Sequence, residues 1–425
     1  MLIHVVRPGD TVYNIARQYD VPMERIIADN ELKTPQMLTP GQALIILYPR
    51  QVVTVQPGDT LGSLAARYGT TVDQIWQYNP QLGGSDRIVP GQKLVLSYEE
   101  PKYGRLAVNG YAYPNIDRAI LYKTLPYLTY LSVFSTGFGE DGRVLPFDSR
   151  GLPQAARAYG VAPLLVLTTL GQDGRFSGDR GHTLLQSATM QENLITSLEQ
   201  MLPAQGYAGV DVDFEYLPPE DVQAYADFVA ELTRRLNQKN LIVFAALAPK
   251  TSADQRGVLY ESHDYNALGR AANGVLAMTY EWGHSGSVPM AVAPLNQVKR
   301  VMDYAVSEIP PSKLFMGVPN YGYDWTLPTV PGSRARSIGN VQAVDQAVDV
   351  GAAIEYAMPQ QTPHYNYYRG GQQHEVWFED ARSIRAKLDL ASSYGLRGIS
   401  IWNLMRWFPQ LWTVLSTMFA IEKIR

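Results

Sequence analysis

One pattern of apolar and polar positions occurs twice within residues 1–99. Apolar side chains recur at i, i+3, i+4 and i+7 from Val12 and again from Leu61, so a short amphipathic helix is expected in each copy. Pro-Gly-Asp-Thr precedes both helices, and its Asp or Thr can cap the first turn. A β-rich run comes before that motif, and a second helix and a closing strand (43–47 or 93–96) come after it. The pattern predicts two small β-α-α-β units.

From residue 104 onward, short apolar runs alternate with longer amphipathic segments. The strand candidates are 106–111, 130–134, 164–168, 209–214, 241–247, 275–280, 314–319 and 398–402. Helical segments between them include 188–201, 219–237, 295–307 and 381–394. Eight strands alternating with helices predict an α/β fold, a (β/α)8 TIM barrel preceded by the two small units.

Two breaks divide the chain into units at 1–49, 50–99 and 100–425. Pro49-Arg50-Gln51 joins the first two units and is a linker too short for them to tumble freely. The stretch 99–102 is charged and interrupted by proline, so the barrel is expected to begin there.

The fourth strand candidate carries a row of acids. Asp211, Asp213 and Glu215 alternate with Val212 and Phe214, so the three carboxyl groups share one face of the strand. Burying like charges side by side is costly unless some of them hold protons. Such a row is typical of a site with separated pKa values. The alternative, an amphipathic strand with a wet acidic face, fits the apolar flanking sequence poorly.

Composition excludes several classes of protein and site. The net charge of −4 is not segregated along the chain, so neither nucleic acid nor an anionic membrane is an expected partner. The absence of Cys excludes disulfides, thiol catalysis and thiolate metal sites. The six His residues form no HxH or HExxH pair, and neither a metal nor another cofactor is expected. No stretch is apolar enough to span a bilayer and no Sec signal peptide is visible after Met1, so membrane insertion is not expected.

The repeated unit closely resembles the LysM module, which binds glycans containing N-acetylglucosamine, such as peptidoglycan and chitin. The resemblance places a sugar groove between the turn before the first helix and the loop before the closing strand. The residues expected beside this groove are Gly9, Asp10, Thr11, Gly58, Asp59 and Thr60. These residues could instead serve only as caps and turns. For Asp10 and Asp59 we expect a capping role, with the neighbouring backbone contacting the ligand.

The acidic strand resembles the fourth-strand signature DGxDxDxE of the family 18 glycoside hydrolases, which include chitinases. Other family motifs follow in order at 110–112, 278–281, 316–322 and 398–402, and the resemblance covers roughly residues 104–420. The sequence departs from the family pattern in three places. Ala208 stands for the first Asp, Glu281 replaces an Asp on strand 6, and 168–171 read Thr-Thr-Leu-Gly where SxGG is usual.

The family resemblance implies a retaining mechanism in which the substrate's own 2-acetamido oxygen attacks the anomeric carbon. It implies that Glu215 is the general acid and then the base, and that Asp213 holds the acetamide N–H. Asp211 would support Asp213, and Tyr280 would fix the acetamide oxygen. Trp402 would stack beneath the sugar. The competing interpretations make Asp211 structural, Tyr280 a satisfied barrel tyrosine and Trp402 a core residue.

Other aromatic and polar residues are candidates for substrate binding at the rim. Tyr111 lies in the strand-1 motif, and Glu281 and Tyr321 lie in the motifs of strands 6 and 7. Further candidates for stacking against sugars are Trp282, Tyr323, Trp325 and Trp377. Tyrosine is abundant, with 27 residues against 11 Phe, which suits a sugar-binding surface and also ordinary half-buried positions.

Two modules, the absence of Cys and the sequence Met-Thr-Tyr-Glu-Trp-Gly at 278–283 resemble a narrower group. These are the spore germination hydrolases of Bacillus-type bacteria, which lyse cortex fragments. The resemblance implies an N-acetylglucosaminidase located in the coat and cortex region of the spore, with peptidoglycan or cortex fragments as its partner, and we expect a monomer. The alternatives are a chitinase or chitooligosaccharide hydrolase, and a non-catalytic glycan-binding protein. The intact Asp213-x-Glu215 pair argues against the last of these.

Overall fold

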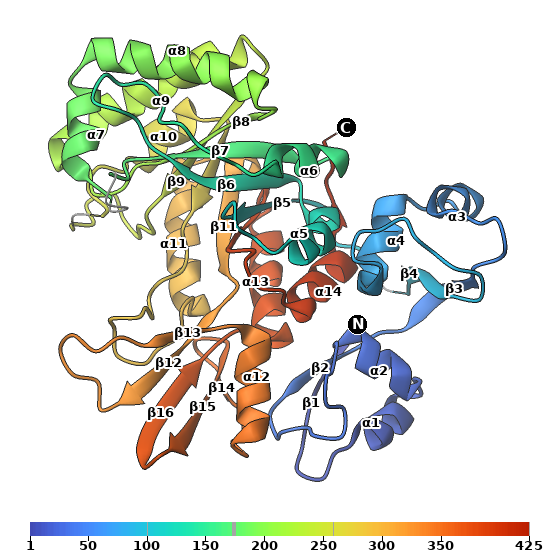
Figure 1. Cartoon of the computed structure of the whole chain (residues 1–425). Helices are drawn as coiled ribbons and strands as arrows, with labels where there is room; N and C mark the ends of the chain where they lie inside the picture. The colour runs from blue at the N-terminus through green and yellow to red at the C-terminus, as the bar shows by residue number, and fades with distance from the viewer. Residues whose placement is uncertain (100, 172–175, 258, 425) are drawn as a thin grey trace.

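The computed structural model describes residues 1–99, 101–171, 176–257 and 259–424. Glu100, which falls within the predicted boundary at 99–102, lies outside the described residues. Two small units lie side by side along one flank of a barrel, and a further small sheet extends from one end of the barrel (Figure 1).

Each small unit is a two-stranded antiparallel sheet with two helices, in the predicted order β-α-α-β. The first unit consists of β1 (Leu2–Val5), α1 (Val12–Tyr19), α2 (Met23–Asp29) and β2 (Ala43–Ile46). The second consists of β3 (Pro49–Thr54), α3 (Leu61–Tyr68), α4 (Val72–Tyr78), a 3-10 turn (Pro80–Leu82) and β4 (Lys93–Tyr98). The predicted linker 49–51 is therefore the start of β3, where Pro49 pairs with Tyr98.

A buried asparagine at equivalent positions of the repeat holds each unit together. Asn30 Nδ2 donates to the carbonyls of Ile26 and Ile45, at 2.9 and 2.8 Å, and its Oδ1 accepts from Ile45 N at 2.7 Å. Asn79 makes the same three bonds, to Ile75 and Val95. The side chain thus replaces backbone partners between the end of the second helix and the closing strand, which explains its recurrence.

The threonine, rather than the aspartate, of Pro-Gly-Asp-Thr caps the first helix of each unit. Thr11 Oγ1 accepts from Asn14 N at 3.1 Å, and Thr60 Oγ1 accepts from Ser63 N at 3.0 Å. Asp10 and Asp59 accept instead from the backbone N–H three residues earlier, at 2.7 and 2.8 Å. The expected capping role of the two aspartates is therefore wrong. They lie one position before the N-cap and close the preceding turn.

Eight parallel strands form the barrel. They are β5 (Arg105–Ala112), β6 (Tyr130–Thr136), β7 (Ala162–Thr168), β8 (Gly209–Asp213), β9 (Ile242–Leu247), β10 (Gly274–Ala277), β11 (Leu314–Pro319) and β17 (Gly398–Trp402). Each pairs with the next, and β17 pairs with β5 in parallel, which closes the ring. The predicted (β/α)8 barrel is confirmed. A short β18 (Ala420–Ile421) pairs in parallel with the N-terminal end of β5.

Helices surround this ring and cover its outer face (Figure 1). They are α5 (Arg118–Thr124), α6 (Leu152–Ala158), α7 (Gly178–Leu185), α8 (Ala188–Ala204), α9 (Val222–Asn237), α10 (Tyr265–Ala271), α11 (Leu295–Glu308), α13 (Ala381–Ser393) and α14 (Pro409–Met418). Short 3-10 turns lie at Leu125–Tyr127, Pro219–Asp221 and Pro311–Lys313. The predicted segment 219–237 therefore opens as a 3-10 turn before α9.

Alternation along β8 places its apolar and acidic side chains on opposite faces. Val210 and Val212 are fully buried in the apolar layer between the strands and the helices, together with Phe214 just beyond the strand. The Phe214 ring stacks on Phe228 of α9, with centroids 5.9 Å apart. Asp211 and Asp213 face the inside of the barrel because successive strand residues point to opposite sides. Packing on the outer face thus fixes the direction of the acids.

An additional sheet between β11 and α13 was not predicted. It contains β12 (Gly322–Leu327), β13 (Arg336–Ile338), β14 (Glu355–Ala357), β15 (Thr362–Arg369) and β16 (Gln372–Trp377), with α12 (Asn340–Asp349). All its pairings are antiparallel, in the order β13-β12-β16-β15-β14. The Gly370-Gly371 dipeptide between β15 and β16 is the hairpin signal that would have revealed it.

The first unit is bonded directly to the barrel and to this additional sheet. Thr39 Oγ1 donates to Ala352 O at 2.6 Å, and Ile354 N donates to Pro40 O at 2.8 Å. Gly41 is required at this contact, because a Cβ there would lie 1.7 Å from Ile354 O. Glu31 accepts from Lys123 Nζ at 2.8 Å and from Trp407 Nε1 at 3.0 Å. These bonds hold the first unit in one orientation on the barrel.

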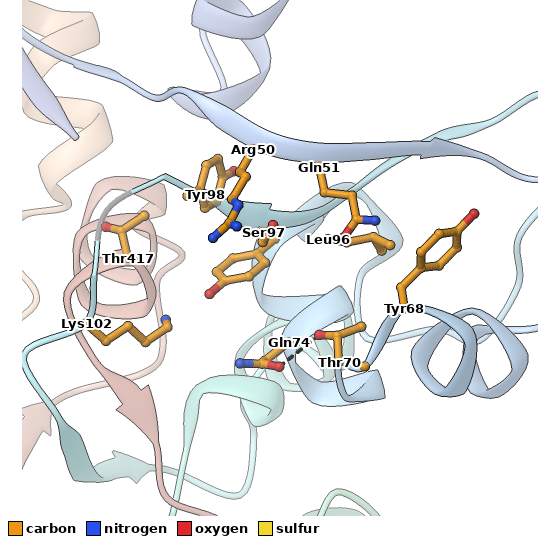
Figure 2. A pocket seen from close by; sticks show the side chains of 12 residues that line it. Arg50, Gln51, Tyr68, Thr70, Gln74, Leu96, Ser97, Tyr98, Lys102 and Thr417 are labelled. Carbon is orange, nitrogen blue, oxygen red and sulfur yellow. Dashed lines mark hydrogen bonds between the residues drawn. The ribbon is translucent and has the colours of Figure 1, made fainter.

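The second unit meets the barrel around a polar cavity of about 620 Å³. Gln51, Tyr68 and Gln74 of the unit line one part of it, and Lys102 and Thr417 line the part next to the barrel (Figure 2). Lys102 Nζ donates to Phe419 O at 3.0 Å, and burial lowers the pKa of its ammonium group to about 8. The predicted groove residues 58–60 do not line this cavity.

Candidate active site

A cavity of about 910 Å³ opens at the carboxyl ends of the barrel strands. The predicted site residues that line it are Tyr111, Asp213, Glu215, Tyr280, Glu281, Trp282 and Trp402. Asp211 lies one strand position deeper, and Tyr321 reaches the site through Glu281. Trp325 and Trp377 are buried in the additional sheet and do not line the cavity. The residues predicted beside the grooves of the small units are not part of it.

Asp211 is fully buried and is fixed by hydroxyl groups. Ser132 Oγ donates to its Oδ2 at 2.9 Å, and Tyr111 also hydrogen-bonds to it. Burial raises the pKa of Asp211 to about 6, although these two hydrogen bonds oppose the rise. Its other oxygen, Oδ1, has no hydrogen-bond partner among the described residues. Two hydroxyl groups, from the neighbouring strands β5 and β6, thus hold Asp211 in place.

Asp213 occupies the next inward position, at the end of β8. Burial raises its pKa well above the ordinary value, and the nearby carboxyl groups of Glu215 and Asp211 raise it further. Its Oδ1 is buried and also lacks a partner within the described part of the chain. A buried carboxyl oxygen without a partner is costly, so a ligand that donates a hydrogen bond would be favoured there.

Glu215 lies two residues beyond β8, which ends at Asp213, one residue earlier than the predicted strand 209–214. The following residue, Tyr216, has φ +61°, and this left-handed turn directs the chain away from the strand. The Glu215 carboxyl group is half-buried, and burial raises its pKa to about 7. A substantial fraction of Glu215 therefore carries a proton near neutral pH, as a general acid requires.

Tyr280 lies after β10, which ends at Ala277, earlier than predicted. Gly317 on the neighbouring β11 leaves room for its ring, because a Cβ there would lie 2.8 Å from Tyr280 Cε1. Tyr280 is close enough to the acids that Asp213 and Glu215 both raise the pKa of its hydroxyl, after burial as the main cause. The tyrosine therefore shares the cavity with both carboxyl groups.

Trp402 lies at the end of β17 within a cluster of aromatic rings. The centroids of Tyr111 and Phe134 each lie 5.2 Å from it, and Tyr113 lies at 6.2 Å, all in edge-on contacts. Sequence reasoning missed Tyr113 and Phe134, along with other lining residues: Phe176, Tyr216 and Tyr260. Tyr113 lies two residues after Tyr111, so alternation at the end of a strand was the signal that could have found it.

Glu281 faces both this cavity and a smaller one beside it. The hydroxyl of Tyr321 donates to its Oε1, and the hydroxyl of Tyr323 lies 3.2 Å from the same oxygen. Burial raises the pKa of Glu281, and the two tyrosine hydrogen bonds oppose the rise. The backbone at Glu281 has φ +66°, which turns its side chain toward these tyrosines. Glu281 thus links the segment after β10 to the segment after β11 at the rim of the barrel.

These groups together suit acid-catalysed cleavage of a sugar acetal. Glu215 supplies a proton, Asp213 supplies a buried oxygen without a partner, Tyr280 supplies a hydroxyl and Trp402 supplies an aromatic surface. Among the described residues no group of three His, Cys, Asp or Glu is arranged to hold a metal ion. In the same part of the chain no helix is long and apolar enough to cross a membrane.

Comparison with protein families gives two matches. The family described as Glycosyl hydrolases family 18 matches residues 167–406, and the LysM domain matches residues 4–47 and 53–97.

Similar proteins match over the whole chain. The cortical fragment-lytic enzyme of Bacillus subtilis (strain 168) is 37% identical over 100% of this chain and 99% of its own length. That of Bacillus anthracis is 36% identical over 99% of each chain. Among solved structures, the spore cortex-lytic enzyme SleL of Bacillus megaterium QM B1551 matches with a TM-score of 0.84 and 36% identity, covering 99% of this chain and 98% of that chain.

Proposed function

This chain belongs to glycosyl hydrolase family 18, and from this premise we propose that it hydrolyses β-1,4 bonds after N-acetylglucosamine in peptidoglycan, with spore cortex fragments as its substrate. One observation carries the proposal. The Asp213 and Glu215 carboxyl groups, both with raised pKa, share a cavity in a chain that matches cortical fragment-lytic enzymes from end to end.

The proposed reaction has two steps, both of the substrate-assisted type found in this family. In the first, the acetamido oxygen of the bound sugar attacks its own anomeric carbon, and the bond to the leaving oxygen breaks. Glu215 gives its proton to that oxygen. In the second, Glu215 takes a proton from water as the water attacks the anomeric carbon and opens the oxazolinium ring. Two inversions at one carbon retain the β-configuration.

Asp213 is the proposed partner of the acetamide N–H. Its partnerless Oδ1 supports this role, because accepting that N–H would remove the cost of a buried oxygen without a hydrogen bond. Asp211, fixed by Ser132, would hold Asp213 in place and share a proton with it. Tyr280 would donate to the acetamide oxygen, and Trp402 would lie beneath the sugar, with Tyr111, Glu281 and Tyr321 shaping the rim.

The mechanism limits where cortex glycan can be cut. The sugar at the cleavage site must carry an acetamido group that can swing toward its anomeric carbon. A muramic δ-lactam has its nitrogen tied into a ring and cannot supply this group. The requirement excludes muramic δ-lactam from the cleavage site, and of the remaining acetamido sugars we propose N-acetylglucosamine.

The two LysM modules are glycan-binding units of the same chain. We assign them to residues 1–49 and 50–99, with the barrel at 100–425, and place their grooves beside Gly9, Asp10, Thr11, Gly58, Asp59 and Thr60. Action as a monomer in the coat and cortex region of the spore completes the proposal.

Comparison of two substrates tests the proposed function. The chain is expected to release reducing ends from purified spore cortex fragments with a higher kcat/KM than from chitin oligosaccharides of matched length. Reducing ends would be quantified at equal concentrations of N-acetylglucosamine units. Chitin oligosaccharides cut as well as or better than cortex fragments would favour a chitinase instead. Failure to cut either glycan would favour a non-catalytic glycan-binding protein.

A further inference from the structure

A second cavity, of about 230 Å³, adjoins the active site. Glu281 and Trp402 line both cavities, so a glycan bound over Trp402 can extend from one into the other. The remaining wall includes Tyr323 and Ser337 of the additional sheet, and Asn403 and Arg406 of the loop after β17. Two separate elements therefore converge on this cavity.

Arg406 is the residue of this cavity that carries a positive charge. Its Nη1 donates to Ser337 Oγ at 3.0 Å, and its backbone carbonyl accepts from Asn320 Nδ2 at 2.8 Å. Gly339 lets the Arg406 side chain lie close to the backbone of residue 339, because a Cβ there would be 3.1 Å from Arg406 Cδ. Arg406 is thus fixed both at its guanidinium group and at its backbone.

The charge of Arg406 is not neutralised within the described residues, since none of their carboxylates forms an ion pair with it. Arg336 nearby differs, because Asp324 accepts from it at 2.7 Å. The acid that shares the cavity, Glu281, is engaged by the hydroxyls of Tyr321 and Tyr323. An unpaired guanidinium group beside a sugar-binding cavity suits a carboxylate on the substrate, to which arginine can donate two parallel hydrogen bonds.

Resting on the proposed function, we propose that Arg406 is a specificity-determining residue that binds a carboxylate on the muramic sugar next to the N-acetylglucosamine at the cleavage site. The two sugars of peptidoglycan alternate, so both neighbours of that N-acetylglucosamine are muramic units. Whichever way the glycan lies, the sugar entering the second cavity is therefore of the muramic type. Its carboxylate is that of the lactyl group or of an attached stem peptide, whereas a muramic δ-lactam, whose lactyl carboxyl is tied into the ring, carries none. Chitin has neither.

Steady-state kinetics with three tetrasaccharides test this role. The first alternates N-acetylglucosamine and N-acetylmuramic acid with free lactyl carboxylates, the second carries stem peptides on the lactyl groups, and the third is chitotetraose. Arg406→Gln is expected to lower the ratio of kcat/KM for the charged substrate to that for chitotetraose about tenfold, through KM. Arg406→Lys keeps the charge without the two-pronged donor and is expected to lose part of the ratio. Arg369→Gln, an exposed charge at the tip of β15, is the matched control and is expected to keep it.

Salt provides an independent reading. Raising the ionic strength is expected to increase the wild-type KM for the charged tetrasaccharides and to leave that of Arg406→Gln much less affected. A lower ratio with only one of the charged tetrasaccharides supports the proposal and identifies the source of the carboxylate. Equal losses on charged and neutral substrates, or no loss at all, would overturn it. Wild-type protein that cuts none of the three would instead reject the proposed function.

Discussion

Replacing Glu215 with glutamine is expected to lower kcat on N-acetylglucosamine-containing oligosaccharides by roughly 10³-fold. The amide keeps the size of the side chain but can neither give a proton to the leaving oxygen nor take one from water. Both chemical steps therefore lose their catalyst, whereas KM is expected to change little. Initial rates with chitotetraose and with cortex fragments would measure the loss. Unchanged turnover on both substrates would remove Glu215 from the mechanism.

The same variant is expected to differ from the wild type in how its free energy of unfolding depends on pH. In the folded chain the pKa of Glu215 is raised from 4.5 to about 7, so between these pH values the folded state holds more protons than the unfolded state. The stability contribution of protonated Glu215 is complete below pH 4.5 and is lost as the pH rises through 7. Glu215→Gln cannot titrate and is expected to gain on the wild type over that interval.

The gain can reach about 3 kcal/mol, less what solvent screening removes from a half-buried group. Denaturant unfolding of both proteins at pH 4.5 and 7.5 would measure it as a widening gap in the free energy of unfolding. Parallel stabilities at both pH values would show that the Glu215 carboxyl does not have a raised pKa.

Replacing Asp213 with asparagine is expected to lower kcat on the order of 10²-fold. The carboxyl group accepts the acetamide N–H and stabilises the positive charge that develops as the glycosidic bond breaks. The amide retains an oxygen that can accept but has no negative charge to offer. Asp227→Asn, an exposed position on α9, is the matched control and is expected to retain full activity. Initial rates of both variants would be compared with the wild type.

Azide distinguishes this role from that of a covalent nucleophile. If Asp213 attacked the anomeric carbon itself, azide would replace it in Asp213→Asn, displace the leaving group and give an α-glycosyl azide. In the substrate-assisted scheme the acetamido oxygen still attacks first, so no α-azide is expected. Detection of that product by NMR would contradict the scheme.

The parts of the fold that repeat or alternate could be predicted from the sequence. Val12 and Leu61 start equivalent helical patterns, and the eight apolar runs became the eight strands of the barrel. The additional sheet could not be found the same way, because its strands pair antiparallel and interrupt the strand–helix rhythm between β11 and α13. The hairpin at Gly370-Gly371 was a local signal overlooked within that rhythm.

The candidate site was predictable where one residue's position depends on its own strand. Asp211 and Asp213 follow from alternation along β8, and Trp402 from its place at the end of β17. Contacts between distant segments could not be predicted. The bonds from Tyr321 and Tyr323 to Glu281, and the approach of Ser337 to Arg406, depend on how the additional sheet folds over the barrel. Likewise, spacing alone could not decide whether Asp10 or Thr11 caps its helix, because that depends on the backbone angles at each residue.

The identity of the new reducing-end sugar tests the central claim most directly. Spore cortex fragments would be digested, reduced with borohydride and analysed by mass spectrometry. Cleavage after N-acetylglucosamine predicts reduced N-acetylglucosamine at every newly formed end. Reduced muramic sugars at those ends would contradict this cleavage site, and reduced muramic δ-lactam would also contradict a mechanism that depends on a mobile acetamido group.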